Sequence, residues 1–260
     1  MPTVITIANQ KGGVGKTSAA MNIASILGES HRVLLIDADP QGNSTDTYCA
    51  QVRDAATLFD VILDIDDPLP IMDAIQKTES GDIIASDPLL RDADVRFPSD
   101  GNEYFRLKDA LAGLHGYNFV VIDTGPADNK ILKNCLVASD LVIIPITADR
   151  YSIQGLSQLS SSIAAQQMRN NPSLKIAGLL LSKYKRRQIL AKEVRASLDD
   201  IASRMGTRVF NATIRECAAV QKAQARRTML SKYDPRCTAL SDYRELVAEL
   251  LQEELDEQKR

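Results

Sequence analysis

The sequence has few cysteines and histidines, the residues that form the disulfides of small secreted proteins and many metal and hydrolase sites. Its four cysteines are widely spaced and none forms a Cys-x-x-Cys pair, so we expect reduced thiols rather than a disulfide framework or a zinc site. The two histidines, His31 and His115, accompany no Ser-His-Asp or metal-ligand set. No run approaches the ~18 apolar residues that cross a bilayer, and the N-terminus lacks the basic region of a signal peptide. We therefore expect a cytoplasmic chain that needs no membrane partner.

What is present is the composition of a soluble globular protein. Of the 260 residues, 44% are hydrophobic and 25% are charged, and a chain of this length buries a full core unaided. No linker, internal repeat or low-complexity segment divides it. We expect residues 1–255 to form one domain, followed by a short frayed tail at 256–260.

Apolar runs without alternation recur along the chain, with helical patterns between them. Such runs are typical of parallel strands that are covered on both faces. The pattern predicts an α/β fold with a doubly wound, mostly parallel sheet and helices on both faces. We expect strands at residues 3–8, 33–36, 83–85, 119–122, 141–144, 176–181 and 209–210, helices at 17–27 and 239–255, and loops at 64–70 and 92–102.

The net charge of −3 conceals a basic third of the chain. Residues 169–232 hold fifteen Lys or Arg and four Asp or Glu, a net charge of +11, whereas the remainder carries −14. A chain with such a segment can bind polyanions in spite of an acidic pI. The alternative is a solvated basic face without a partner.

A glycine-rich segment, residues 11–17, lies between the first predicted strand and helix. This context is the one that a phosphate-binding loop requires, because glycines let successive backbone N–H groups turn toward phosphate oxygens. Lys16 would reach the β- and γ-phosphates, and the Thr17 hydroxyl would ligate Mg²⁺. The usual pattern has glycine where this chain has Gln10, and the chain adds a second lysine, Lys11.

Three aspartates follow predicted strands. Asp37 and Asp39 end the second strand, and Asp123 ends the run 119–122. Ligands of open α/β sheets bind at the carboxyl ends of the strands, where a carboxylate near a γ-phosphate can position water or Mg²⁺. Asp-x-Asp alone is equally typical of a turn or a helix cap.

Together these motifs resemble those of the ParA/MinD ATPases. Residues 10–17 are similar to the family's deviant Walker A motif, 33–43 to its switch I segment, and 119–126 to Walker B running into switch II, where the family more often has proline than Gly125. The resemblance implies that Lys11 is the signature lysine, which crosses a dimer interface to the partner's phosphates. It further implies an ATP-bound sandwich dimer.

The resemblance also implies roles for individual residues. Lys11, Lys16 and Asp39 would be catalytic, with Asp39 orienting the attacking water, and Thr17, Asp37 and Asp123 would serve Mg²⁺. Residues 213–215 resemble the start of the loop that contacts the base. The implied site for ATP comprises Lys11, Gly12, Gly13, Val14, Gly15, Lys16, Thr17, Ser18 and Arg215.

A ParA-like role is the function that the resemblance and the basic third favour. An ATP-dependent homodimer would bind double-stranded DNA nonspecifically, associate with the nucleoid, and segregate or position plasmid or chromosome DNA. A ParB-like activator would stimulate an otherwise slow hydrolysis. Lysine and arginine neutralise phosphates without reading bases. The predicted DNA contacts are Lys183, Lys185, Arg186, Arg187, Lys192, Arg195, Lys222, Arg226 and Arg227.

Three other functions of related ATPases remain as alternatives. A MinD-like membrane cycle needs a basic amphipathic C-terminal helix, whereas the last helix here is mainly acidic. An iron–sulfur carrier needs paired cysteines, and Cys135 after switch II has no partner at that spacing. An ATP-dependent small-molecule ligase would use the same phosphate loop with a substrate pocket that a sequence does not reveal.

Overall fold

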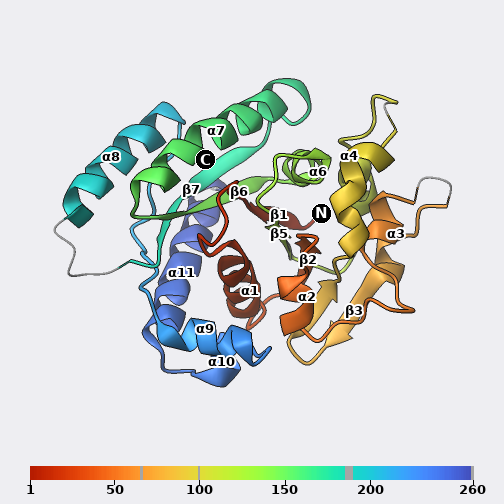
Figure 1. The fold of residues 1–260 in the computed structure, drawn as a ribbon, viewed down its shortest axis with the longest axis horizontal. Helices are drawn as coiled ribbons and strands as arrows, with labels where there is room; N and C mark the ends of the chain where they lie inside the picture. The colour runs from red at the N-terminus through yellow and green to blue at the C-terminus, as the bar shows by residue number, and fades with distance from the viewer. Residues whose placement is uncertain (65–66, 99, 185–189, 259–260) are drawn as a thin grey trace.

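Strands and helices alternate along the chain and assemble into a layered α/β structure (Figure 1). The computed structural model describes residues 1–64, 67–98, 100–184 and 190–258. Its strands are β1 (Thr3–Ile7), β2 (Val33–Ala38), β3 (Ile75–Thr78), β4 (Gly81–Ile84), β5 (Phe119–Thr124), β6 (Leu141–Thr147) and β7 (Lys175–Ser182). Its helices are α1 (Lys16–Leu27), α2 (Asn43–Thr47), α3 (Leu58–Ile62), α4 (Ala93–Arg96), α5 (Arg106–Ala112), α6 (Lys130–Ala138), α7 (Arg150–Arg169), α8 (Leu190–Arg204), α9 (Ala218–Ala225), α10 (Leu230–Tyr233) and α11 (Thr238–Gln258).

The seven strands form a sheet in the order β3-β4-β2-β5-β1-β6-β7. Every pairing is parallel except that of β3 with β4, which is antiparallel. Strands β2 to β5 lie on one side of β1, and β6 and β7 lie on the other. The direction in which the chain adds strands therefore reverses at β1, and such a switch point is where doubly wound sheets open a crevice for ligands. The predicted fold class is confirmed.

Both faces of the sheet are buried, as the apolar runs predict. Along β5, Phe119 and Val121 pack into a cluster with α1 and α11, whereas Val120 and Ile122 pack on the opposite face against α3, α5 and α6. A third cluster joins β6 and β7 to α7 and α8. Because successive strand residues point to opposite faces, two helical layers cover one sheet.

The register of the central strands brings two motif aspartates side by side. Asp37 of β2 pairs with Asp123 of β5, and Asp123 also stands opposite Ile7 at the end of β1. The loops that follow β1, β2 and β5 therefore leave the sheet at the same edge. The glycine-rich segment is one of these loops.

The structure differs from the sequence prediction at the periphery. The edge strand Ile75–Thr78 was not predicted, because its four residues are half-buried or exposed and carry little apolar pattern. Residues 209–210 are not a strand, since Val209 makes only an isolated bridge to Leu179. Residues 92–102 are not wholly loop, because α4 lies within them. The final helix runs to Gln258, past the predicted end at 255, so residues 256–258 are helical rather than frayed, and 259–260 lie outside the described residues.

Candidate functional site

The glycine-rich segment forms a tight loop whose shape depends on two glycines. Gly13 has φ +75° and Gly15 has φ +97°, in the left-handed region that residues with a side chain rarely adopt. No other atom lies within 4 Å of a Cβ placed at Gly13, so backbone conformation rather than crowding requires glycine there. Gly15 precedes α1 and has no side chain to cap it. The first N–H groups of α1 are therefore left for an anion, in the manner of phosphate-binding loops.

Lys16 is buried beneath this loop. Only 7% of its surface is exposed, and its Nζ donates to the carbonyl of Lys11 at 3.3 Å. Burial lowers the pKa of the ammonium group, and the carboxylates of Asp123 and Asp39 oppose that shift. An additional anion beside Lys16 would compensate its desolvation, which suits a group that binds phosphate.

Asp123 and Asp37 are fully buried next to each other. Burial and the neighbouring Asp37 raise the pKa of Asp123 to about 8, and burial raises the pKa of Asp37 to about 6. One carboxylate oxygen of Asp123 accepts from the Ser44 hydroxyl at 2.8 Å, but its Oδ1 is buried without a hydrogen-bond partner. An orphaned carboxylate oxygen is a poor structural group and a good ligand for a hard cation.

Some side chains around Asp123 are suited to bind Mg²⁺, whereas others are already hydrogen-bonded to neighbouring residues of the protein. The Thr17 hydroxyl opposes the rise in the pKa of Asp123, which places it beside the carboxylate that has an unpartnered oxygen. Asp37, in contrast, accepts from the N–H and hydroxyl of Thr45 at 2.7 and 2.8 Å and from the N–H of Asp39 at 3.2 Å. Thr17 and Asp123 fit a Mg²⁺ ion, whereas Asp37 holds the start of α2 in place, and its part in the Mg²⁺ shell remains a prediction.

Asp39 faces the loop from the opposite wall, and Gly125 leaves it room. The Oδ1 of Asp39 accepts from the N–H of Gln41 at 3.0 Å. A Cβ at Gly125 would lie 3.3 Å from that same oxygen and 3.6 Å from the Pro40 ring. Gly125, which departs from the family's usual proline, therefore lets the two loops approach closely.

Lys11 is held by an aspartate that the sequence analysis missed. Its Nζ lies 2.6 Å from Oδ1 of Asp149, and the Thr147 hydroxyl donates to the other oxygen of that carboxylate. The backbone N–H of Lys11 is bound by Asn9, whose side chain in turn donates to the Pro145 carbonyl. The loop is thus anchored to the end of β6. No local spacing announces Asp149, because 138 residues separate it from Lys11.

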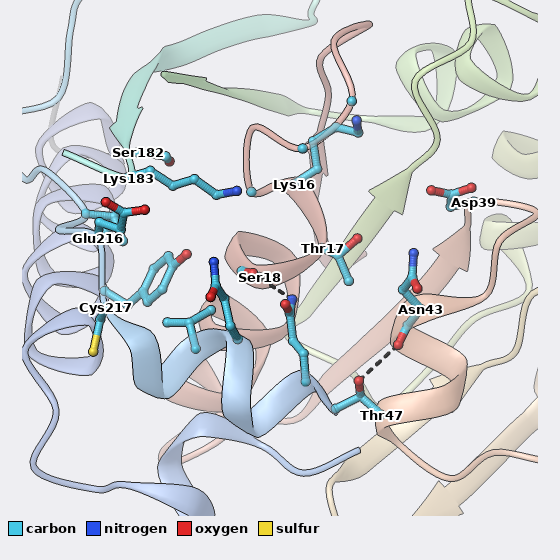
Figure 2. A pocket seen from close by; sticks show the side chains of 18 of the residues that line it. Lys16, Thr17, Ser18, Asp39, Asn43, Thr47, Ser182, Lys183, Glu216 and Cys217 are labelled. Atoms are coloured by element: carbon cyan, nitrogen blue, oxygen red, sulfur yellow. Dashed lines mark hydrogen bonds between the residues drawn. The ribbon is translucent and has the colours of Figure 1, made fainter. Parts of the chain in front are cut away.

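The glycine-rich loop, Lys16, Thr17 and Asp39 line a cavity of about 400 Å³. Figure 2 shows Asp39 and Asn43 on one side of the loop and Ser182, Lys183 and Glu216 on the other. Further wall residues come from α9 and α11. Gln224 of α9 donates to the Ser18 hydroxyl at 2.9 Å, which ties that wall to α1.

Arg215, predicted to contact the base, lies on the cavity wall, but its side chain has another partner. Its Nε donates to both oxygens of Asp242 at 3.0 and 2.9 Å, and its backbone N–H donates to the same carboxylate at 2.8 Å. The pair fastens the wall segment to α11. Val14, another predicted site residue, is buried, so that only its backbone could serve a ligand.

The predicted DNA contacts fall into different surroundings. Arg195 donates to the carbonyls of Phe210 and Val209 at 3.0 and 3.2 Å, which gives it a structural role. Lys183 points toward the phosphate loop, and its φ of +54° is unusual for lysine (Figure 2). Lys222, Arg226 and Arg227 are exposed on and just after α9, and Arg227 pairs with Asp46 at 2.9 Å.

The remaining predicted contacts lie beyond what the structure describes. These are Lys185, Arg186 and Arg187, and the side chain of Lys192. Figure 1 shows the described parts of α8 and α9 well apart. Among the described residues, no helix combines the length and apolar character needed to cross a bilayer.

Comparison with known proteins agrees with this geometry. A family model for an AAA domain matches residues 2–176. The chromosome partitioning protein ParA of Caulobacter vibrioides is 34% identical over 99% of this chain and 97% of its own. The sporulation initiation inhibitor protein Soj of Bacillus subtilis is 31% identical over 96% of this chain and 98% of its own.

Solved structures of similar fold include nucleotide complexes. A plasmid partition protein of Borrelia burgdorferi bound to AMPPNP has a TM-score of 0.80 at 26% identity, covering 97% of this chain and 100% of its own. Cobyrinic acid a,c-diamide synthase of Mycobacterium smegmatis with bound ADP and magnesium has a TM-score of 0.82 at 28% identity, covering 97% and 95%. With its phosphate loop, buried lysine and paired aspartates, and with relatives of this identity along its whole length, the chain belongs to the ParA/MinD family of phosphate-loop ATPases.

Proposed function

We propose that this protein is a partition ATPase that hydrolyses ATP, dimerises with ATP, and binds DNA nonspecifically until a ParB-like protein stimulates hydrolysis. One observation in the site supports the hydrolysis of ATP: the buried unpartnered oxygen of Asp123 beside Lys16 and Thr17. The relatives named as partitioning proteins, which are similar along almost the whole chain, support the role in partition.

Within one chain, the loop binds and orients the nucleotide. The N–H groups at the start of α1 and the Lys16 ammonium hold the phosphates. Thr17 and Asp123 would hold Mg²⁺, which when bound offsets the negative charge that builds on the phosphates. Asp39 faces the loop and orients the attacking water. Gly125, by its lack of a side chain, leaves room for the Asp39 carboxylate in this position.

Lys11 supplies the coupling between dimerisation and hydrolysis. In the proposed dimer it leaves Asp149 and reaches the phosphates that the partner chain binds. A cation delivered from a second molecule stabilises transition-state charge in other phosphate-loop enzymes as well. Hydrolysis is therefore slow in single chains and faster in the assembled dimer.

The exposed lysines and arginines serve DNA in this proposal. Lys222 and Arg226 are exposed on and beside α9, and dimerisation doubles the number of such cations. Each phosphate contact releases counterions, so that affinity falls steeply with salt. The same dependence on ATP and salt gives nucleoid association when ATP is bound and release after hydrolysis.

DNA binding across a salt series, with ATP, with ADP and without nucleotide, tests the proposal. We expect binding with ATP only, weakened by Lys222→Ala combined with Arg226→Ala at unchanged ATP affinity. The matched control is Lys77→Ala with Arg91→Ala, which removes the same charge from exposed residues of β3 and of the short 3-10 helix Pro88–Asp92 that follows β4. Equal DNA binding in all nucleotide states, or equal loss in both double variants, contradicts the proposal.

A second candidate function follows from the similarity to the cobyrinic acid a,c-diamide synthase structure. A ligase of that kind would use the same loop to activate a carboxylate. ATP consumption that rises with a carboxylate substrate and an amine donor, and not with DNA or a partner protein, would favour this alternative.

A further inference from the structure

The chain forms a bulge where β7 ends at the wall of the nucleotide cavity. The backbone of Ile214 donates to the Leu181 carbonyl at 2.8 Å and accepts from the N–H of Tyr184 at 2.9 Å. A regular parallel ladder leaves one residue between two such bonds, whereas Ser182 and Lys183 both lie between them here. One residue is therefore inserted, and a bulge of this kind redirects a side chain, often beside an active site.

Lys183 occupies the strained position of this bulge. Its φ of +54° lies in the left-handed region, which glycine adopts at little cost and lysine rarely adopts. The backbone bonds of Leu181 and Tyr184 fix the chain on both sides of it. Strained residues persist where the surrounding structure holds them, and they gather at ligand sites. Since glycine would suit this backbone better, a lysine here indicates a use of its side chain.

The Lys183 side chain extends into the nucleotide cavity. It lines the cavity together with Gly13 and Lys16, and Figure 2 shows it directed toward the phosphate loop. Within the part of the chain that the structure describes, no carboxylate forms an ion pair with Lys183. An ammonium group that faces an anion-binding loop and has no acidic partner there is suited to pair with a phosphate.

Ser182, the other residue of the bulge, has a buried hydroxyl that lacks a partner. Only 2% of the residue is exposed, it lines the same cavity, and its Oγ makes no hydrogen bond. This oxygen lies 3.9 Å from a Cβ placed at Gly15, the last glycine of the loop. Buried hydroxyls are nearly always hydrogen-bonded. The orphaned group therefore indicates a ligand oxygen on this side of the loop, independently of Lys183.

The position of the bulge relative to Asp39 indicates which phosphates it would meet. Asp39, which orients the attacking water in the proposed function, lies on one side of the loop, and Ser182 and Lys183 lie on the other (Figure 2). Groups on the side away from Asp39 are remote from the γ-phosphate and nearer the phosphates that ATP and ADP share. Contacts made equally before and after hydrolysis change nucleotide affinity and KM without changing kcat.

We propose that the bulge at Ser182 and Lys183 is a second phosphate-binding element, in which Lys183 pairs with the phosphates common to ATP and ADP. Lys183 thereby belongs to the nucleotide site rather than to the DNA contacts expected from the sequence. The inference rests on the proposed nucleotide binding and adds to it a residue that recognises the phosphate chain from the side opposite Asp39.

The test measures the affinity of the whole protein for ADP and for a non-hydrolysable ATP analogue, each with Mg²⁺, by isothermal titration calorimetry. Lys183→Asn removes the charge, and asparagine tolerates positive φ, so the melting temperature of the nucleotide-free protein should not fall. Both affinities should fall about tenfold, the equivalent of one charge-assisted hydrogen bond. The KM for ATP should rise while kcat stays unchanged. Lys183→Arg, which keeps the charge, should retain affinity within about threefold.

Two further variants separate the bulge from a general effect of charge. Ser182→Ala removes the orphaned hydroxyl, so it should weaken both nucleotides about fivefold without lowering the melting temperature. Lys175→Asn removes an exposed lysine from the other end of β7 and is the matched control, which should bind nucleotide as the parent does.

The outcomes distinguish this inference from the proposed function. A parent protein that binds neither nucleotide would overturn both. If the parent binds both nucleotides, equal binding by Lys183→Asn would overturn this inference alone. So would a loss of affinity for the ATP analogue but not for ADP, or a loss of DNA binding at unchanged nucleotide affinity, because Lys183 would then meet the γ-phosphate or DNA instead.

Discussion

The ion pair between Lys11 and Asp149 predicts that removing the aspartate's charge strengthens dimerisation. If Lys11 must reach the partner's phosphates, Asp149 competes for it within each chain, at a distance of 2.6 Å. Asp149→Asn removes the competing charge and keeps the size of the side chain. We therefore expect a tighter ATP-dependent dimer, whereas an ordinary loss of structure would weaken it.

The size of the effect follows from the exposure of the pair. The side chains of Lys11 and Asp149 are 32% and 40% exposed, so solvent screens their attraction, and such pairs contribute ~0.2–1 kcal/mol. A symmetric dimer frees two lysines, which gives ~0.4–2 kcal/mol and a dimer dissociation constant lower by about 2- to 30-fold. The difference should shrink as salt rises.

Sedimentation equilibrium with Mg²⁺ and a non-hydrolysable ATP analogue measures this constant. Glu29→Gln is the control, because it breaks a pair with Arg244 of the same 2.6 Å length and comparable exposure, far from the loop. Only Asp149→Asn should tighten the dimer. An unchanged or weaker dimer in Asp149→Asn would refute the competition between the aspartate and the partner's phosphates.

Three further substitutions test the site. Lys11→Ala should abolish ATP-dependent dimerisation and stimulated hydrolysis while nucleotide binding persists, and a normal dimer would disprove the role in trans. Gly125→Ala should slow hydrolysis severalfold with little loss of melting temperature, since the new methyl group displaces only the Asp39 carboxylate; a loss of stability without a loss of rate would contradict this. Because the folded pKa of Asp123, about 8, exceeds its unfolded value, its contribution to stability is present below pH ~4 and lost as pH rises to about 8. In thermal unfolding without nucleotide, Asp123→Asn should therefore gain on the parent as pH rises from 5 to 8, and an equal pH dependence of both proteins would count against it.

The sequence was informative where function depends on local geometry. The phosphate loop was predictable because Gly13 and Gly15 must adopt positive φ between a strand and a helix. The aspartates were predictable because parallel strands end at one edge, and the register of Asp37 with Asp123 follows from that. Both features rest on a few neighbouring residues and on the general rules of parallel sheets.

Partners brought together by the tertiary fold could not be predicted in this way. Asp149 meets Lys11 across the sheet, and Asp242 of α11 binds Arg215. In each case the side chain's chemistry was evident and its partner was not, because the partner depends on packing rather than on pattern.

The burial of Lys16, Asp37 and Asp123 lowers the stability of the nucleotide-free protein, although the same buried charges serve nucleotide binding. Two adjacent carboxyls with raised pKa values and an ammonium with a lowered one all lose hydration in the folded chain. Binding of the magnesium nucleotide would supply the missing opposite charges, and a ligand at 100 times its dissociation constant stabilises the folded state by ~2.7 kcal/mol. Substitutions that relieve the burial of charge should therefore raise the melting temperature of the nucleotide-free protein. The same substitutions should reduce the further rise in melting temperature that nucleotide produces. The two shifts, measured together, separate a residue that binds nucleotide from one that is merely structural.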